Sequence, residues 1–519
     1  MSKRSNRSRR TWAQRLVLSI NAVLVIACIG AGLGLMRVRH TIESLPVVDI
    51  GSSLAPSTVE SSEPRNVLII GTDNAEGIDK NDPVMKNRDI GTSLADVIMI
   101  LRVDPTDHSV RLLSIPRDTR VELPSGRMGR INAAMAGIGG EANLVRTIKY
   151  NFGIPIDNYI QLDFLGFRKL VEVLGGVPVY FTTPVRDRNS GLAISEPGCH
   201  LLDPNQALAY ARARHFYFYE DGKWRPDGSG DLGRITRQQD FIKRALRSAA
   251  EKGLRNPTTA LGLVNAASSA VRMDTTLDVG TLVGLVREFQ DFNPDSLQSM
   301  QIPTKAAPRG GVAYQDVIWD EAEPLLEQFR GVADPGALRP SDIIVQVSST
   351  SQTDSNAATI EQALDGVGFN ADVWKSGAKS RSTTIYYGPS SRRAAIQVAS
   401  YLESFPQFSY DESLRGYQVR LTPGSDFGGV RKEPIGLEDM DADKLPEPTD
   451  AELAASQPPS QPVVNGGEGG KASPGSEVAS PDESPSNDQP AVEDTQPPEP
   501  DEGAPGVVPT DPEASALCR

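Results

Sequence analysis

Seven charged or polar side chains that could act on phosphate groups stand near the ends of apolar runs or near predicted helix ends. They are Asp73, Asp96, Arg117, Arg212, Arg214, Arg234 and Gln238. Guanidinium groups present forked donors that match phosphate oxygens, and several arginines brought together repel one another unless a polyanion lies between them. Carboxylates and phosphate oxygens are the ligands that Mg²⁺ prefers. The set therefore predicts a site for a pyrophosphate and a divalent cation.

Each of these residues also has an ordinary structural interpretation. An Asp after a Gly, as at Asp73, is common in turns, and an Arg-x-Arg pair on a surface is usually solvated. Arg234 could pair with Asp231, and Arg237 with Asp240, on one helix face. Asp231 could instead cap that helix, whose positive N-terminal end favours anions. These alternatives stay open on the residues alone.

Short apolar runs and helical patterns alternate along the chain, which is typical of an α/β domain. The predicted strands are Asn66–Gly71, Val97–Val103, Val110–Ile115 and Val177–Phe181. The predicted helices are Glu141–Phe152, Phe164–Leu174, one from Asp203 to about Ala211, Asp231 to about Lys252, Pro257–Met273 and Leu277–Phe292. The candidate residues fall mostly at strand ends and helix starts, where α/β sheets usually form their sites.

A second, smaller α/β module is predicted over residues 340–425. Its expected strands are Ile343–Val347, Phe369–Trp374, Thr383–Tyr387 and Tyr417–Leu421, and its expected helices are Ala357–Leu364 and Ser391–Leu402. Residues 426–519 are rich in Pro, Ser, Glu and Asp. Such a segment buries too little apolar surface to offset its chain entropy, so we predict a disordered tail.

The formal net charge of −14 is concentrated in this tail. From Gly428 to Arg519 there are 20 acidic and 5 basic residues, so the preceding 427 residues carry a net charge of +1. A near-neutral folded part argues against a nucleic-acid binder. With three Cys and four scattered His in the chain, a disulfide-dense scaffold and a His- or Cys-based metal centre are also disfavoured.

The N-terminal residues have the pattern of a membrane anchor. Residues 16–36 contain no charged side chain, and at about 1.5 Å per residue they would span about 31 Å as a helix. Residues 1–15 hold six basic and no acidic side chains, which predicts a cytoplasmic basic segment before the transmembrane helix. A cleaved signal peptide is the alternative, but no small-x-small cleavage site follows the run. Residues 37–64 are expected to be an extracytoplasmic linker. Cys199 and Cys518 would both face an oxidising exterior, and the sequence leaves open whether they pair.

Several stretches in a fixed order resemble the LytR-CpsA-Psr family of cell-envelope proteins. They include NVLIIGTD, ADVIMILRVDP, LLSIPRDTRVELP, GCHLLDPNQALAYARAR and GDLGRITRQQDFIKRAL. The resemblance covers residues 65–335 as a catalytic domain, and residues 340–425 resemble the LytR C-terminal domain. It implies a three-layer α-β-α fold with a mixed central sheet and a groove that accommodates a lipid.

The resemblance also implies an activity. Members of this family transfer a glycopolymer from a polyprenyl-pyrophosphate carrier to peptidoglycan at the outer face of the membrane, assisted by Mg²⁺ or Mn²⁺. By this similarity Asp73 and Asp96 hold the metal and Asp73, Asp96 and Arg117 act in catalysis. The pyrophosphate would lie on Arg117, Arg212, Arg214 and Arg234, with Gln238 beside them. One aspartate is expected to accept the proton of the attacking hydroxyl.

Two features depart from the usual family pattern. Leu94 stands where many members carry an arginine, so one phosphate contact is expected to be either missing or supplied elsewhere, for example by Arg88 or Arg102. Residues 76–91 are longer than in the shortest family forms and could form a lid. The extended aromatic stretch between Arg214 and Asp231 could shape acceptor binding, lipid binding or only local packing. The polymer stays open, with arabinogalactan or a related wall glycan favoured. A pyrophosphate phosphatase, transfer of glycan to a surface protein, a wall-binding scaffold and a transcription attenuator are the alternatives.

Overall fold

The computed structural model describes two folded domains and a single residue near the C-terminus. It covers residues 47–55 (except 49), 63–79 (except 77), 82, 94–137 (except 106–108), 139–251, 271–277, 293–330, 338–349, 355–375, 380–447 (except 437 and 438) and 518. Within these ranges no helix has the length and apolar character needed to cross a bilayer. The predicted basic segment 1–15, the predicted span 16–36 and most of the extended segment 76–91 lie outside the described residues.

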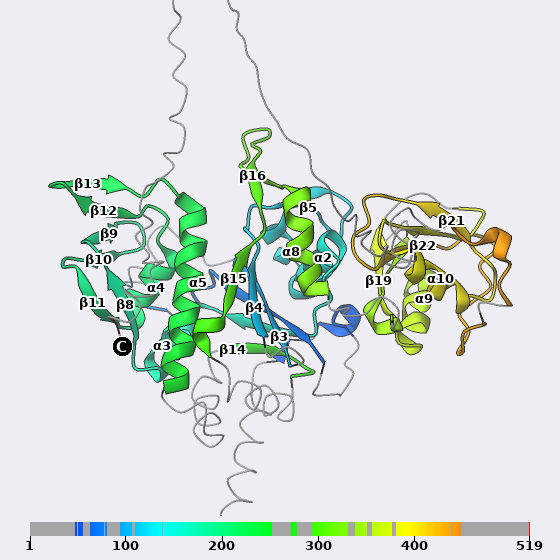
Figure 1. The fold of residues 1–519 in the computed structure, drawn as a ribbon, viewed down its shortest axis with the longest axis horizontal. Coiled ribbons are helices and arrows are strands. Elements are labelled where there is room, and N and C mark those ends of the chain that lie inside the picture. The colour runs from blue at the N-terminus through cyan, green and yellow to red at the C-terminus, as the bar shows by residue number, and fades with distance from the viewer. Residues whose placement is uncertain are drawn as a thin grey trace, which may run out of the picture. The chain divides into compact units, whose positions relative to one another are not determined.

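The first domain is built around a seven-stranded mixed sheet (Figure 1). Its strands, in spatial order, are β1 (Val47–Val48), β14 (Val271–Asp274), β7 (Asn158–Leu162), β2 (Arg65–Thr72), β3 (Ala95–Asp104), β4 (Ser109–Ser114) and β15 (Gln298–Gln301). The central strand β2 runs parallel to β7 and antiparallel to β3.

Alternating side chains of this sheet pack against helices on both faces. Leu68 and Ile70 of β2 pack with α2 (Gly140–Phe152) and α8 (Trp319–Arg330) in one core. Ile69, between them, belongs to a second cluster that includes Leu246 of α5 (Gly230–Ala249). Since successive residues of a strand face opposite ways, this arrangement gives three layers. The predicted α-β-α architecture with a mixed sheet is confirmed.

A smaller lobe with its own core extends from the α5 side of the sheet. It contains α3 (Phe164–Val173), α4 (Pro204–Arg212), the pair β8 (Val177–Phe181) and β11 (Gly198–Leu202), and a four-stranded sheet of β10 (Leu192–Ile194), β9 (Val185–Asp187), β12 (Tyr217–Glu220) and β13 (Lys223–Pro226). The predicted start of α4 is confirmed. Asp203 and Gln206 form a reciprocal capping box, and Pro204 occupies the first turn.

Short elements complete the first domain. They are the hairpins of β5 (Arg120–Glu122) with β6 (Met128–Arg130) and of β16 (Thr304–Ala306) with β17 (Gln315–Val317), and the 3-10 turns Gly51–Ser53, Ile131–Met135 and Pro294–Ser296.

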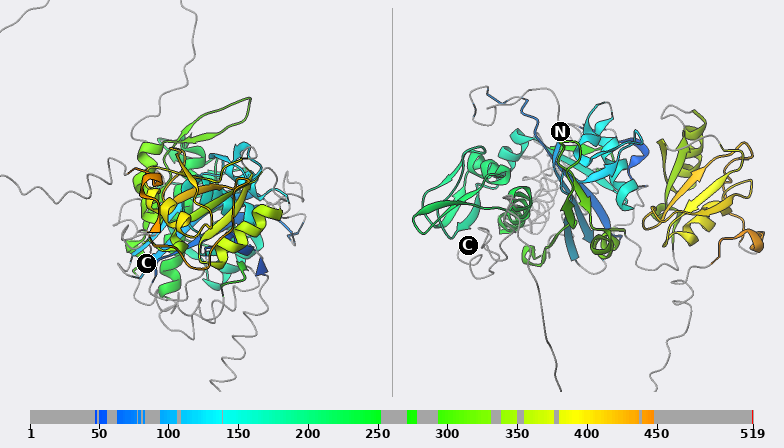
Figure 2. Two further views of the ribbon diagram at one scale, coloured as in Figure 1. Left: turned by 90° about the vertical axis from the view of Figure 1, so that its right-hand side faces the viewer. Right: turned by 90° about the horizontal axis from the view of Figure 1, so that it is seen from above.

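The second domain is the small α/β module that the sequence predicts. Its five-stranded sheet has the order β19 (Asn370–Lys375), β18 (Ile344–Ser349), β22 (Gln418–Thr422), β20 (Thr384–Tyr387) and β21 (Gln407–Tyr410). The helices α9 (Ser355–Gly366) and α10 (Arg392–Ser400) pack against it (Figure 2). The strand β21 was missed because its residues show no apolar alternation: none of its four side chains is fully buried.

A sealed polar cluster joins the two domains. Lys149 of α2, fully buried, donates to the carboxylate of Asp372 and to Asn370, both on β19. Arg146 reaches the other carboxylate oxygen of Asp372 at 3.1 Å, and the Tyr150 ring stacks on Trp374 with ring centroids 3.7 Å apart. The two domains therefore share a packed, hydrogen-bonded interface.

Several predicted boundaries differ from the structure. Within the predicted linker, Val48, Ile50 and Leu54 are buried in the first domain's core. At the other end, the fold continues past residue 425, because Val430, Ile435, Met440 and Leu445 join the core of the second domain. Val271–Met273, predicted as the end of a helix, form most of strand β14, whereas residues 257–270 and 278–292 lie outside the described part of the chain.

Cys199 and Cys518 form a disulfide with Cα atoms 5.3 Å apart. This pairing ties the C-terminal end of the chain to strand β11 and resolves the question that the sequence left open.

Candidate functional site

A β-bulge at the end of β2 and the start of β3 places the two predicted aspartates. Gly71 pairs with Val97 and Thr72 with Ala95, so Asp96 is the extra residue on β3. Bulges of this kind redirect one side chain and are common beside active sites. A Cβ on Gly71 would lie 2.9 Å from the Cβ of Val97, so only glycine fits here. Asp73 follows directly, and its carboxylate accepts from the backbone N–H of Leu94 at 3.1 Å.

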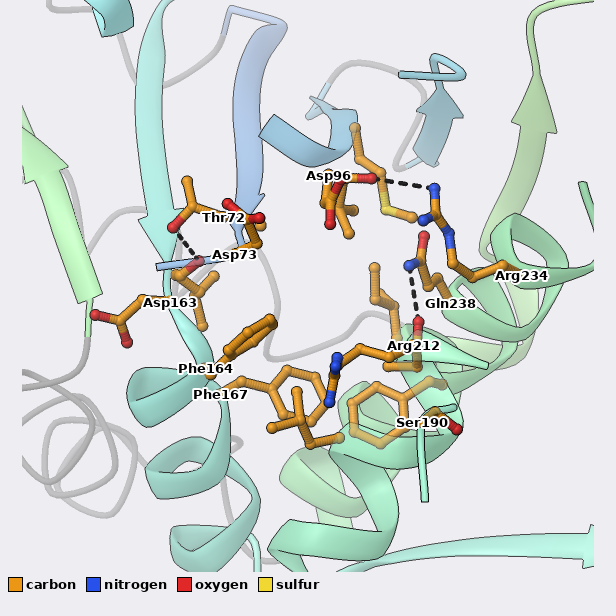
Figure 3. A pocket seen from close by; sticks show the side chains of 18 of the residues that line it. Thr72, Asp73, Asp96, Asp163, Phe164, Phe167, Ser190, Arg212, Arg234 and Gln238 are labelled. Carbon is orange, nitrogen blue, oxygen red and sulfur yellow. Dashed lines mark hydrogen bonds between the residues drawn. The ribbon is translucent and has the colours of Figure 1, made fainter. Parts of the chain in front are cut away.

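Three predicted arginines converge on Asp96 from different elements. Arg117, just after β4, donates to Asp96 Oδ1 at 2.5 Å, and Arg214, beyond the end of α4, lies 3.6 Å from the same oxygen. Arg234, in the second turn of α5, donates to the backbone carbonyl of Asp96 at 3.2 Å. The sequence-distant segments therefore meet at one point, as Figure 3 shows for Asp96 and Arg234.

Asp231 completes this network in a role that the sequence left uncertain. It lies inside the first turn of α5 rather than at its N-cap, and its carboxylate reaches Arg214 Nε at 3.3 Å and Arg234 at 3.0 Å. The Nε atoms of Arg117 and Arg234 are buried with no hydrogen-bond partner among the described residues. Arg117 Nε lies 3.6 Å from Asp118 Oδ2, a distance longer than a hydrogen bond, so a phosphate oxygen would compete with Asp118 for this donor.

The surroundings shift the pKa of several members. Burial acts to raise the pKa of Asp96, but the charges of Arg117, Arg214 and Arg234 outweigh it, so that the pKa lies below its ordinary value. Burial lowers the pKa of Arg234 to about 10, with Arg214 adding to the effect and Asp231 opposing it. Burial and the charge of Arg117 also lower the pKa of Arg214. Crowded cations of this kind become more stable when an anion binds between them.

All seven predicted site residues line one cavity of about 1020 Å³ between the central sheet and helices α3 to α5. The cavity has two chemically different parts. Asp73, Asp96 and the arginines lie at the strand ends, while Phe164, Phe167, Leu170, Phe241 and Leu246 line an apolar part between α3 and α5 (Figure 3). Arg212 lies where the parts meet, with its guanidinium carbon 4.9 Å from the centre of the Phe164 ring.

Other polar residues around the cavity have mainly positioning contacts. The amide of Gln238 donates to the carbonyl of Ala211 at 2.9 Å, which joins α5 to α4. Asp187 accepts from the backbone N–H groups of Arg214 and His215, each at 2.9 Å, and so fixes the loop after α4. The sequence analysis did not identify Asp187. It is the last residue of the three-residue strand β9, and no motif marks it.

The expectation that Arg102 replaces the missing arginine at position 94 is wrong. Arg102 is buried near the other end of β3, within 3.5 Å of Asn66 and Asp104, and does not line the cavity. Leu94 itself lines it, and Arg88 lies outside the described residues.

The aspartates fit a divalent cation only if the substrate supplies further ligands. Within the described residues no group of three or more His, Cys, Asp or Glu side chains could hold a metal ion. Asp73 and Asp96 nevertheless line the same cavity, and Mg²⁺ is commonly held by one or two carboxylates together with phosphate oxygens and water. The donor set is therefore compatible with Mg²⁺ or Mn²⁺ bound together with a pyrophosphate.

Comparison with known proteins gives a consistent result. Residues 41–330 match the model of the LytR_cpsA_psr family, and residues 342–427 match the model described as LytR cell envelope-related transcriptional attenuator. A polyisoprenyl-teichoic acid–peptidoglycan teichoic acid transferase TagU from Halalkalibacterium halodurans is 31% identical over 221 residues, which are 42% of this chain and 64% of that protein. The probable cell wall biosynthesis protein LcpB from Corynebacterium glutamicum is 29% identical over 318 residues, 58% of this chain and 71% of LcpB.

Among solved structures, a LytR-Csp2A-Psr enzyme from Actinomyces oris has 24% sequence identity and a TM-score of 0.44, covering 56% of this chain and 96% of that one.

Proposed function

Because the chain belongs to the LytR-CpsA-Psr family, we propose that it transfers a glycopolymer from a polyprenyl-pyrophosphate carrier to peptidoglycan. The TagU relatives are named for a transfer of this kind, and wall-polymer transfer is the activity that the site residues support. Arabinogalactan or a related wall glycan is the polymer we favour. The catalytic domain would work at the outer face of the cell membrane, anchored by the apolar residues 16–36.

The observation that carries the proposal is the cavity with two parts. A polyprenyl pyrophosphate has a long apolar chain attached to a compact polyanion. The apolar part between α3 and α5 suits the chain, and the arginines at the strand ends suit the anion. A scaffold that only binds the wall would have no use for a buried arginine cluster beside an apolar cavity.

In the proposed reaction, Arg117, Arg214 and Arg234 hold the pyrophosphate, and Arg212 lies at the junction with the lipid. A hydroxyl of the peptidoglycan glycan attacks the sugar-side phosphorus. The new P–O bond forms as the bond to the bridging oxygen breaks, and polyprenyl phosphate leaves with that oxygen. The arginines stabilise the charge on the leaving phosphate. A bound Mg²⁺ or Mn²⁺, held by Asp73 and Asp96, would supply further charge neutralisation.

The proton of the attacking hydroxyl needs an acceptor within the cavity. The lowered pKa of Asp96 makes its carboxylate a weak base, since three arginines stabilise the charged form. Asp73 lines the same cavity, and its carboxylate accepts the backbone N–H of Leu94 at 3.1 Å. We therefore propose that Asp96 orders the arginines, and that an aspartate of the cavity not engaged by the metal accepts the proton.

The test is transfer from a short-chain lipid pyrophosphate that carries a glycan, with peptidoglycan as acceptor and with or without Mg²⁺. The proposal predicts glycan covalently linked to peptidoglycan, and strongly reduced transfer in Arg212→Ala and Arg234→Ala. Arg309→Ala is the matched control, because Arg309 is exposed, pairs with Asp316 at 2.6 Å and does not line the cavity. Release of the glycan phosphate into solution without transfer would establish a phosphatase instead. Full transfer by both cavity variants would refute the site.

A further inference from the structure

An exposed face of the small lobe carries an unusual set of aromatic side chains. Tyr217 and Tyr219 of β12 are 37% and 39% exposed, whereas Phe218 between them is buried in the lobe's core. Across the pairing, Tyr219 lies opposite Trp224 of β13, and Tyr217 lies opposite Arg186 of β9. Since paired residues project on the same side of a sheet, these four form one surface, here called the aromatic face.

The side chains of the aromatic face are ordered by contacts with one another. The Tyr219 and Trp224 rings meet edge to face with centroids 5.3 Å apart. The Arg186 guanidinium carbon lies 3.9 Å from the centre of the Trp224 ring. The hairpin turns through Asp221 and Gly222, both at positive φ, which matches the tight turns that connect paired strands. Large apolar rings held at a surface, with polar edges, are typical of an interaction site.

The sheet that carries the aromatic face has one end at the cavity, while the four side chains of this face project from the side opposite Asp187 and Phe218. β9 ends at Asp187, whose carboxylate holds the backbone of Arg214 and His215. The loop after β9 contributes Asn189 and Ser190 to the cavity wall. β12 begins three residues after Arg214, at most about 10 Å along an extended chain.

The hairpin is also fixed to the helix that carries Arg234. Arg237 of α5 donates to Asp227, just after β13, at 2.8 Å, and its guanidinium lies over the Phe216 ring at 4.4 Å. The β12–β13 hairpin therefore adjoins the N-terminal end of α5, as Figure 1 shows. The apolar part of the cavity runs the other way along α5, through Phe241, Leu246 and Ala249. From Arg234 to Ala249 the helix rises about 22 Å.

This polarity decides which part of a donor meets the aromatic face. A lipid chain in the apolar part extends towards the C-terminal end of α5, so the glycan on the far side of the pyrophosphate must leave towards the N-terminal end. The faces of sugar rings carry C–H groups that pack on aromatic rings, and sugar hydroxyls bond to guanidinium and phenol groups. The charged groups beside the face, Arg186, Lys223 and Arg225 with Glu220 and Asp221, nearly balance.

We propose that the aromatic face binds the glycan of the lipid-linked donor at sugars beyond the one attached to the pyrophosphate. This inference rests on the proposed function and extends it to the recognition of the polymer. The aromatic face would position the donor and favour longer glycans, while the arginines act on the phosphates.

The experiment compares two donors with the full chain. Both carry the same short lipid pyrophosphate, one with a single N-acetylglucosamine and one with an arabinogalactan-type oligosaccharide. In Trp224→Ala and Tyr219→Ala, KM for the long donor should rise about 3- to 10-fold, with unchanged kcat and unchanged KM for the short donor. Tyr219→Phe keeps the aromatic ring, so KM for the long donor should rise much less in this variant than in Tyr219→Ala. Tyr410→Ala, which removes a 54% exposed tyrosine from β21, is the matched control.

Other outcomes overturn the inference. Equal changes for both donors, or none, would mean that the aromatic face does not bind the donor glycan. A raised KM for peptidoglycan alone would assign it to the acceptor. Calorimetric binding of the two donors without acceptor separates this inference from the proposed function. Suppose that no transfer occurs, that the long donor binds more tightly than the short donor, and that Trp224→Ala removes this difference. The aromatic face would then still bind the donor glycan, and only the proposed reaction would be wrong. Equal binding of both donors by the unmodified chain would refute glycan binding by the aromatic face, whether or not transfer occurs.

Discussion

Two clusters of buried charge in this protein have opposite designs. Around Asp96, three arginines share the aspartates Asp96, Asp118 and Asp231 beside an open cavity, and two guanidinium Nε atoms have no hydrogen-bond partner among the described residues. Around Asp372, the ammonium of Lys149 is enclosed between domains and donates to Asp372, Asn370 and the carbonyl of Ser53.

The difference separates a binding site from a structural contact. A closed network of charges serves the folded state, because removing one partner leaves another buried and uncompensated. A cluster of arginines that is open to a cavity can form further ion pairs when an anion arrives. The following predictions test this contrast.

The largest effect on stability is expected at the sealed cluster. Lys149→Met leaves the Asp372 carboxylate buried with Arg146 as its remaining cation, and we expect a loss of about 3–5 kcal/mol in the free energy of unfolding. Denaturant unfolding measures it. The double variant Lys149→Met, Asp372→Asn should recover part of the loss. A loss below about 1 kcal/mol in the single variant would mean that the sealed cluster contributes little to stability, and the proposed difference between the two clusters would be wrong.

At the cavity, the large effect should fall on activity. Arg214→Ala removes a cation from the pyrophosphate site, and kcat/KM for transfer should fall about 10²- to 10³-fold. The free energy of unfolding should change by less than about 1 kcal/mol, because this side chain is partly exposed and its ion pairs are screened. Parallel kinetics and unfolding on one preparation check both. Strong destabilisation with proportionate loss of activity would indicate a structural arginine.

An anion should stabilise the folded protein only by binding in the cavity. Inorganic pyrophosphate at about 100 times its dissociation constant should raise the free energy of unfolding by about 2.7 kcal/mol. Arg234→Ala should lose most of this gain, and Lys149→Met should keep it from a lower starting point. Thermal unfolding with chloride at equal ionic strength as control measures the difference. An equal gain in both variants would place the anion elsewhere.

The smallest effect concerns pH, and its sign differs between the two regions. Burial raises the pKa of Asp365, beside the sealed cluster, to about 7. The folded state then binds more protons than the unfolded state, so stability should fall by about 1 kcal/mol as pH rises from about 4 to about 7. Asp365→Asn should abolish this fall. Asp96 acts in the opposite sense: its contribution is present above the ordinary pKa and is lost as pH falls below it. A pH series of unfolding midpoints tests both signs.

The sequence predicts the elements whose signals are local. The strand Arg65–Thr72 contains the apolar run Val67–Ile70, and the helix after Asp203 carries its own capping box. The seven site residues share the cavity, but the reason is visible only in three dimensions, since the bulge that exposes Asp96 depends on the register between β2 and β3.

Features that depend on distant partners could not be predicted. Asp231 contacts two arginines only because α4 and α5 pack together. In the sequence Lys149 is an ordinary helix cation, and only the packing of β19 against α2 makes it a buried partner of Asp372. Strand β1 and the three-residue strands of the small lobe are too short to show a period.

The central claim is that one cavity binds both the apolar chain and the pyrophosphate of a lipid pyrophosphate. The most direct test is calorimetric binding of geranylgeranyl pyrophosphate, compared with inorganic pyrophosphate and with geranylgeraniol. The account predicts that the lipid pyrophosphate binds much more tightly than either part, and that Arg234→Ala and Phe167→Ala each weaken it. Binding no tighter than that of pyrophosphate alone, or unaffected by both variants, would contradict it.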